Sequence, residues 1–235
     1  MDWTKNPQIF ESRRVGSSLT QPGPYLLRDE VSGIILAGGK GQRLGLPKAL
    51  ITMGGESLLL RTVSLFRGLF SEVLVVSGDR ALIPEVPDAT VVVDEVAGIG
   101  PIGGLITALK NMKNERAFCV ACDMPFLDKC LIQYLVSLSN SQEAIVPCVG
   151  GQVESLHAVY SRRCLEIAEE RIKRRQYSLT GLILSVGAKY VHIPSGPGAL
   201  LFFNINTPQD LARAERIYAE TEKRPEKYRL AQVLK

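Results

Sequence analysis

Residues 31 to 50 read Val-Ser-Gly-Ile-Ile-Leu-Ala-Gly-Gly-Lys-Gly-Gln-Arg-Leu-Gly-Leu-Pro-Lys-Ala-Leu. The apolar part, Val31 to Leu36, is typical of a buried strand, and four glycines and three cations follow it. Glycines at the carboxyl end of a strand let the backbone turn tightly and bring bare N–H groups close to a ligand. With cations beside it, such a loop indicates a phosphate ligand. A flexible basic surface turn is the competing interpretation, but the first buried strand of an α/β sheet is where nucleotide loops lie.

The loop matches neither of two common phosphate-binding patterns. Leu44 stands where G-x-G-x-x-G requires its third glycine, and the Gly-Lys-Ser/Thr of a Walker A loop does not occur here. What remains is Leu-Ala-Gly-Gly-x-x-x-Arg-Leu-Gly-x-x-Lys, from Leu36 to Lys48.

The composition bounds the class of protein. The chain has 235 residues, 46% hydrophobic and 22% charged, which is ordinary for a globular protein whose core can support an enzyme site. The net charge of +4 suits anionic small molecules and is too weak to indicate nucleic acid. No apolar run is long enough to span a membrane, and the first thirty residues carry no secretory signal. We therefore expect a cytoplasmic protein without membrane attachment.

Five cysteines, an odd number without the spacing of a disulfide framework, favour a reducing compartment. Cys119 and Cys122 form a C-x-x-C pattern, but they lie within an apolar strand. We expect buried structural thiols there; a redox or metal-binding pair is the alternative.

Strands and helices alternate along the rest of the chain, which predicts an α/β fold with a mainly parallel, doubly wound sheet. Residues 1–30 form an irregular N-terminal extension, 31–220 one domain, and 221–235 a basic tail. A short extended piece is predicted at 49–53. The predicted strands are 31–36, 72–77, 89–93, 117–121, 144–149, 156–160, 190–193 and 201–203, and the predicted helices 57–70, 101–112, 128–138, 162–175, 179–186 and 208–220.

Ligands of an open α/β sheet bind beyond the carboxyl ends of its strands. Ser77 ends one predicted strand, and Asp94 and Asp123 follow two others. Asp123 suits Mg²⁺, which uses few protein carboxylates and fills its other positions with water and phosphate. Capping a turn is its competing role, and the glycine loop favours the metal because a triphosphate needs a cation. Asp94 either joins the metal, contacts the nucleotide or ends its strand in a turn.

The loop from Leu36 to Lys48 resembles the signature of nucleotidyltransferases, and its two-glycine form resembles the molybdenum cofactor guanylyltransferase family. Pro47 and Lys48 resemble cytidylyl and sugar-nucleotide relatives equally. Four further segments resemble the same family in the right order, over about residues 31–215: Gly100-Pro-Ile-Gly-Gly-Leu105, Cys122-Asp-Met-Pro-Phe126, Ser155-Leu-His-Ala-Val-Tyr160 with serine replacing a proline, and Phe203-Asn-Ile-Asn-Thr-Pro-Gln-Asp210.

The resemblance implies a three-layer, Rossmann-like nucleotidyltransferase fold with GTP as the nucleotide donor. It implies nucleotide contacts from Leu36, Ala37, Gly38, Gly39, Lys48, Ser77, Asp94 and Asp123, catalytic roles for Arg43, Lys48 and Asp123, and Mg²⁺ on Asp123. It puts Glu154, His157, Asn204 and Asn206 on the acceptor side. The chain departs from the family after its second strand, where Ser77 or Asp79 replaces an asparagine. His157, judged alone, is more often a packed residue than a catalyst.

The reaction implied is transfer of GMP from GTP to the terminal phosphate of the molybdenum–molybdopterin cofactor, with pyrophosphate as the second product. Molybdoenzymes and other cofactor-biosynthesis proteins are the candidate partners. The same chemistry with CTP or a sugar 1-phosphate is the nearest alternative. A non-catalytic protein that binds nucleotide and delivers pterin is an alternative of another class.

Overall fold

The computed structural model describes residues 30–39, 41–96, 98–138 and 141–223. The predicted N-terminal extension up to position 29, Lys40 in the glycine loop and positions 224–235 of the predicted basic tail lie outside the described residues.

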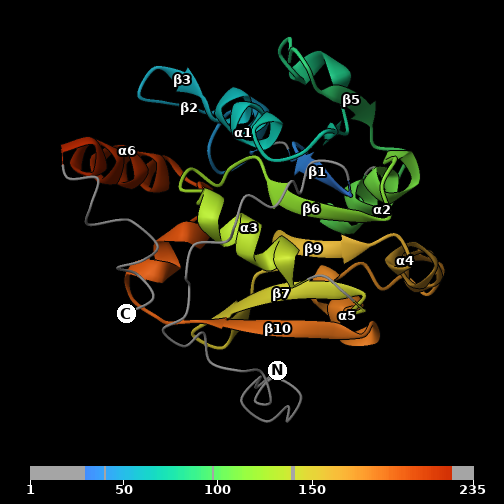
Figure 1. Ribbon diagram of the computed structural model, residues 1–235. Helices are drawn as coiled ribbons and strands as arrows, with labels where there is room; N and C mark the ends of the chain where they lie inside the picture. The colour runs from blue at the N-terminus through green and yellow to red at the C-terminus, as the bar shows by residue number, and fades with distance from the viewer. Residues whose placement is uncertain (1–29, 40, 97, 139–140, 224–235) are drawn as a thin grey trace.

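A sheet of eight strands forms the middle of the domain, and Figure 1 shows it running from β5 at the top to β10 at the bottom. Seven strands follow the order β10-β7-β9-β6-β1-β4-β5, and β8 pairs with β7. The strands are β1 (Val31–Leu36), β4 (Val73–Ser77), β5 (Thr90–Val93), β6 (Arg116–Ala121), β7 (Ala144–Val149), β8 (Gln152–Val153), β9 (His157–Ser161) and β10 (Ala188–Ile193), with a separate pair, β2 (Thr52–Met53) and β3 (Glu56–Ser57).

The sheet is mainly parallel, as predicted. Strand β1 runs parallel to β4 and β6, β4 parallel to β5, and β7 parallel to β10. Strand β9 runs antiparallel to both β6 and β7, and the short β8 runs antiparallel to β7. Because β9 is reversed, its last residue, Ser161, lies opposite Arg116 at the start of β6. The residues after β9 therefore lie at the opposite edge of the sheet from those after β6.

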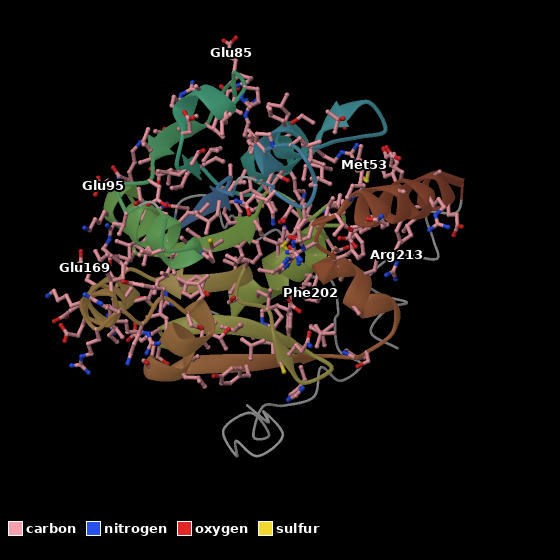
Figure 2. The ribbon with its side chains drawn as sticks, turned by 180° about the vertical axis from the view of Figure 1, so that it is seen from behind. Met53, Glu85, Glu95, Glu169, Phe202 and Arg213 are labelled. Carbon is pink, nitrogen blue, oxygen red and sulfur yellow. The ribbon has the colours of Figure 1, made fainter. Side chains whose placement is uncertain are left out.

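Helices cover both faces of the sheet and give the predicted three layers. Helices α1 (Leu58–Arg67) and α3 (Lys129–Ser137) bury their apolar sides on one face. Helices α2 (Pro101–Asn111), α4 (Cys164–Lys173) and α5 (Leu179–Ser185) cover the other. Helix α6 (Pro208–Lys223) packs against β2 and the glycine loop in a small third cluster. In Figure 2, Glu95 and Glu169 lie at the outer edge of the molecule near α2 and α4, and Phe202 lies inward.

Cys119 and Cys122 are buried, as predicted for structural thiols. They belong to different apolar clusters on opposite faces of the sheet. Burial raises the pKa of both thiols well above the usual value, and a neutral buried thiol is unreactive.

One predicted strand is wrong. Residues 201–203 do not pair with the sheet: Leu201 and Phe202 end the 3₁₀ helix η6 (Pro197–Phe202), which begins after Gly196 with φ 109°, and Phe203 follows it. Leu201 and Phe202 bury their side chains from this helix, and an apolar run this short does not distinguish a strand from a buried turn of helix. The extended piece predicted at 49–53 is likewise split into η4 (Lys48–Leu50) and β2.

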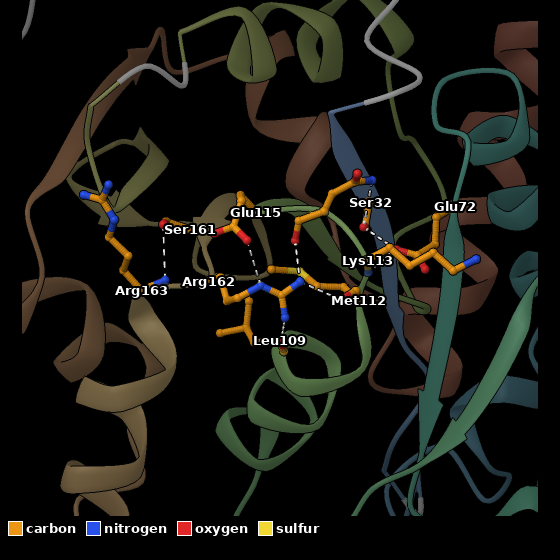
Figure 3. Close-up of polar contacts among 10 residues, drawn as sticks. Ser32, Glu72, Leu109, Met112, Lys113, Glu115, Ser161, Arg162 and Arg163 are labelled. Atoms are coloured by element: carbon orange, nitrogen blue, oxygen red, sulfur yellow. Dashed lines mark hydrogen bonds and ion pairs between the residues drawn. The ribbon is translucent and has the colours of Figure 1, made fainter.

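At the amino ends of the strands, Arg162 ties the sheet to the end of α2 (Figure 3). Its guanidinium donates hydrogen bonds to the carbonyl oxygens of Leu109, Met112 and Asn114, at 2.9, 2.6 and 2.8 Å. The last carbonyls of a helix have no partner within the helix itself, so the arginine satisfies groups that would otherwise need water. Along the described segments, no helix is long and apolar enough to cross a membrane.

Candidate active site

The glycine loop after β1 folds back on itself, and Gly41 makes this possible. Gly41 has φ +54°, and its carbonyl accepts hydrogen bonds from the N–H groups of Leu44 and Gly45. A Cβ on Gly41 would lie 1.8 Å from the carbonyl oxygen of Leu46, so no side chain fits there. The N–H of Lys48 points to the carbonyl of Gly39 at 3.5 Å, and the Lys48 side chain runs alongside Gly39. The loop thus holds Lys48 over the end of β1.

Lys48 meets Asp123 there. The Lys48 ammonium forms an ion pair with Oδ2 of Asp123 and donates a hydrogen bond to Oδ1 of Asn206 at 2.8 Å. Asp123 follows β6, the strand beside β1, and the N–H of Cys122 bonds to the carbonyl of Leu36 at 3.1 Å. The lysine and the aspartate predicted to share one edge of the sheet therefore share one contact.

The second oxygen of Asp123 suits a cation. Asp123 is 1% exposed, and its Oδ1 has no hydrogen-bond partner among the residues described. A buried carboxylate oxygen without a partner is costly, and a bound ion removes that cost. No three His, Cys, Asp or Glu side chains gather into a metal cluster within the described ranges. One carboxylate, with the rest of the shell from substrate and water, is how proteins commonly hold Mg²⁺, so the donor set fits that ion.

Asn206 is held in place by the start of α6. The N–H of Ile205 donates to the backbone carbonyl of Asp123 at 3.0 Å, which fixes this segment over the end of β6. Oδ2 of Asp210 accepts from the N–H groups of Asn206 and Thr207 and from the Thr207 hydroxyl, and Thr207 Oγ1 accepts from the N–H of Asp210. This reciprocal capping lowers the pKa of Asp210, mainly through the Thr207 hydroxyl.

Asp94 lies at the same edge but three strands away from Asp123, about 14 Å at the usual strand spacing. Its Oδ1 accepts from the Thr107 hydroxyl at 2.9 Å and from the N–H of Val96 at 3.0 Å. Ser77, at the end of β4, turns its hydroxyl to the carbonyl of Asp79 at 3.0 Å. Ser77 thus bonds within its own loop, whereas Asp94 bonds both to its loop and to α2, and Asp94 is too far from Asp123 to share its metal.

The predicted backbone contacts with the nucleotide lie between these groups. Leu36 and Ala37 are buried, whereas Gly38 and Gly39 are exposed. A Cβ on Gly38 would meet nothing within 4 Å, so the space above the end of β1 is open to a ligand. Arg43 is exposed on the outer part of the loop, where it is free to reach an anion.

Three of the predicted acceptor residues are linked by contacts: the N–H of His157 bonds to the carbonyl of Glu154 at 3.2 Å, and both His157 and Asn204 contact Phe202. His157 is fully buried between the ring edges of Phe118 and Phe202, and neither ring nitrogen has a hydrogen-bond partner in the described part of the chain. Burial lowers its pKa to about 3. Glu154 is half-buried on the turn between β8 and β9, where burial raises its pKa. Asn204 donates to the carbonyl of Phe202 at 2.9 Å.

The model of the MobA-like NTP transferase domain matches residues 33–185 of this chain. The chain belongs to this family. A probable molybdenum cofactor guanylyltransferase from Pelotomaculum thermopropionicum is 32% identical over 200 residues, covering 81% of this chain and 94% of the relative. Another, from Thermococcus kodakarensis, is 39% identical over 191 residues, covering 77% and 92%.

A crystal structure shares the fold of this MobA-like chain. Molybdopterin-guanine dinucleotide biosynthesis protein A from Archaeoglobus fulgidus superimposes with a TM-score of 0.68 at 24% identity, covering 81% of this chain and 100% of that one. Two features of the site had no clear signal in the sequence: the bond between Asn206 and Lys48, and the hydroxyl of Thr107 on Asp94. Thr107 lies within the apolar run of α2, where a threonine does not differ in pattern from a valine.

Proposed function

We propose that this protein transfers GMP from GTP to the terminal phosphate of the molybdenum–molybdopterin cofactor and releases pyrophosphate. Relatives named as molybdenum cofactor guanylyltransferases, matched over most of their length, support the choice of reaction. The observation that carries the proposal is the contact of Lys48 with Asp123 beside the glycine loop, because it joins a phosphate-binding cation to a carboxylate with a free buried oxygen.

In the proposed reaction, an oxygen of the acceptor phosphate attacks the α-phosphorus of GTP. The bond from that phosphorus to the oxygen bridging to the β-phosphate breaks, and pyrophosphate leaves with the electron pair. A phosphate monoester is already ionised near neutral pH, so the step needs no general base. Catalysis then consists of positioning the two substrates and neutralising their charge.

The residues of the loop supply those two effects. We assign Leu36, Ala37, Gly38 and Gly39 to backbone contacts with the nucleoside, and Lys48 and Arg43 to the phosphates that become pyrophosphate, where cations stabilise the developing charge. Asn206 orients the Lys48 ammonium through its 2.8 Å contact.

Asp123 would hold Mg²⁺, which, when bound, neutralises charge on the α-phosphate and the acceptor. The free Oδ1 of Asp123 is the atom available to the ion. Glu154 and Asn204 are our candidates for contacts with the pterin acceptor. The enclosed ring of His157 favours a packing role for that residue.

A nucleotide panel tests the proposal. Purified protein is incubated with Mg²⁺ and GTP, CTP or ATP, with and without the molybdopterin cofactor, and pyrophosphate is followed. We expect release only with GTP and cofactor together. Release with CTP alone among the nucleotides would identify a cytidylyl transferase of the same fold. GTP bound in a stable complex and never consumed in the presence of cofactor would overturn the enzymatic proposal in favour of a delivery protein.

A further inference from the structure

Thr107 makes hydrogen bonds that a threonine inside a helix does not usually make. It lies in the second turn of α2, fully buried among apolar residues. Its hydroxyl donates to Oδ1 of Asp94 at 2.9 Å and accepts from the N–H of Glu95 at 3.1 Å. Figure 2 shows the side chain of Glu95 at the outer edge of the molecule, so this residue meets Thr107 through its backbone alone.

A second buried threonine shows the usual arrangement. Thr62 of α1 donates its hydroxyl to the carbonyl of Leu58, one turn earlier in the same helix, at 2.9 Å. This bond inside the helix is the common solution for a threonine at such a position. Thr107 instead uses both its donor and its acceptor on the loop that joins β5 to α2. Valine would fill the same space without a polar group, so the role of Thr107 lies in its hydroxyl.

The two carboxylate oxygens of Asp94 differ in their hydrogen bonds. Oδ1 is occupied by the Thr107 hydroxyl and by the N–H of Val96. No hydrogen bond within the described segments reaches Oδ2, which faces the first turn of α2 and lies 3.3 Å from the place of a Cβ on Gly103. No side chain fits at position 103, because its Cβ would also lie 2.4 Å from the carbonyl oxygen of Val96. The loop is therefore packed tightly on α2, and Oδ2 is the carboxylate oxygen without a hydrogen bond among the described residues.

We propose that Thr107 is a positioning residue for nucleotide binding: its hydroxyl fixes the Asp94 carboxylate so that Oδ2 accepts a hydrogen bond from the nucleotide. The inference rests on the proposed function and on the nucleotide contact that the family resemblance implies for Asp94. A carboxylate held at one oxygen is pre-oriented at the other, and pre-orientation improves affinity by reducing the ordering cost of binding. Thr107 itself does not touch the ligand, so its loss acts on affinity and leaves the chemical step intact.

Thr107→Val is the first test, with Thr62→Val as the matched control, since both remove one buried threonine hydroxyl from a helix. We expect the Thr107 variant to raise the KM for GTP and its Kd, measured by calorimetry, by about fivefold to tenfold, with kcat within about twofold of wild type. Thr107→Ser keeps the hydroxyl and should restore both constants. The Thr62 variant should leave KM and Kd unchanged, whatever its effect on the melting temperature.

A double-mutant cycle with Asp94→Asn separates positioning from general damage. Asp94→Asn replaces Oδ2 with an amide or turns it away, so it should weaken GTP binding at least as much as Thr107→Val. Because Thr107 acts through Asp94, the double variant should bind GTP no more weakly than Asp94→Asn alone. Losses that multiply in the double variant would overturn the inference, as would a Kd of Thr107→Val within twofold of wild type.

Different results would refute the proposed function and the role of Thr107. If wild-type protein releases no pyrophosphate from any nucleotide with the cofactor present, the proposed function is wrong. If wild type turns GTP over and Thr107→Val binds GTP as tightly as wild type does, only the role of Thr107 is wrong. Should Thr107→Val prove unfolded, Asp94→Asn with unchanged GTP affinity would still refute the inference.

Discussion

The polar groups at the two ends of the strands differ in how completely they are paired. At the amino ends of the strands, Arg162 donates to three carbonyls and forms an ion pair with Glu115 at 3.4 Å. Close by, Ser32 donates to Glu72 at 2.5 Å. At the carboxyl ends, Asp123 is buried with one oxygen unpartnered among the described residues, and Lys48 leaves about a quarter of its side chain exposed.

This difference indicates that the amino ends of the strands contribute to stability and the carboxyl ends to ligand binding. A saturated network gains nothing from a ligand, because all its donors and acceptors are already used. An incomplete one is costly in the free protein and becomes satisfied when a partner of the right charge arrives. We therefore expect substitutions at the amino edge to change the free energy of unfolding, and substitutions at the carboxyl edge to change turnover and ligand affinity.

The largest effect is expected from Asp123→Asn. Pyrophosphate release should fall on the order of a thousandfold, equivalent to about 4 kcal/mol, because the amide carries no charge to hold a cation. Asp128→Asn is the control, since Asp128 caps α3 through Oδ1 and asparagine caps a helix equally well. Full turnover in Asp123→Asn would remove the metal role from this residue.

Arg162→Leu should lower stability and leave activity nearly unchanged. Three carbonyls lose their donor, so urea denaturation should show a loss of about 3 kcal/mol in the free energy of unfolding, with kcat/KM of the folded enzyme within about twofold. Arg163→Leu is the control. Its ion pair with Glu143 lies at the surface, and such pairs contribute about 1 kcal/mol or less. Equal losses in the two variants would show that the network at α2 has no special weight.

His157 makes stability depend on pH. Burial lowers its pKa in the folded protein from 6.5 to about 3, so between these values the unfolded chain binds a proton that the folded chain does not. Stability therefore falls as the pH falls, by about 2 kcal/mol between pH 8 and pH 5. Glu154, whose pKa is raised by burial, acts in the opposite sense.

The comparison of wild type with His157→Phe isolates the histidine. The variant should lose that part of the slope, measured by urea denaturation at several pH values, and should be the more stable protein at pH 5. Parallel pH profiles for the two proteins would contradict the assignment of His157 as a neutral core residue. A rise in the KM for the pterin acceptor without a change in stability would return it to the acceptor site.

The smallest effect is expected from Lys48→Met in the absence of nucleotide. The ammonium on Oδ2 of Asp123 repels a cation at Oδ1, so removing the charge should tighten Mn²⁺ binding by about tenfold, or about 1.4 kcal/mol. The number of bound ions can be measured by electron paramagnetic resonance. Lys129→Met, at an exposed position of α3, controls for net charge. Unchanged Mn²⁺ affinity in the Lys48 variant would mean that the lysine charge does not weaken cation binding at Asp123.

The sequence predicted the carboxyl edge better than the amino edge, and there is a physical reason. Lys48 and Asp123 follow adjacent parallel strands, and parallel strands bring their ends together by geometry alone. Arg162 follows the reversed strand β9, which a rhythm of alternating strands and helices does not reveal. Asn206 was predicted on the acceptor side, and its contact with Lys48 joins residues 158 positions apart, a pairing that no local pattern contains.

The wrong strand at 201–203 has a different origin. Leu201, Phe202 and Phe203 form an apolar run that satisfies the pattern of a buried strand. In the fold, however, β10 already occupies the position beside β7 at the end of the strand order. Leu201 and Phe202 belong to the 3₁₀ helix η6, where Phe202 packs on His157, and Phe203 follows the helix and packs on Phe126. Tertiary packing decided the outcome, and short apolar segments are where it does so most readily.

The closed turn at Gly41 sets a rule for redesigning nucleotide preference. In a library that randomises the whole loop, most variants could not form the turn, because any side chain at position 41 collides with the Leu46 carbonyl. Position 38 is the better place to begin, because a methyl group there meets nothing within 4 Å. Gly41 is thus the position of this loop to preserve, and Gly38 is the position to vary.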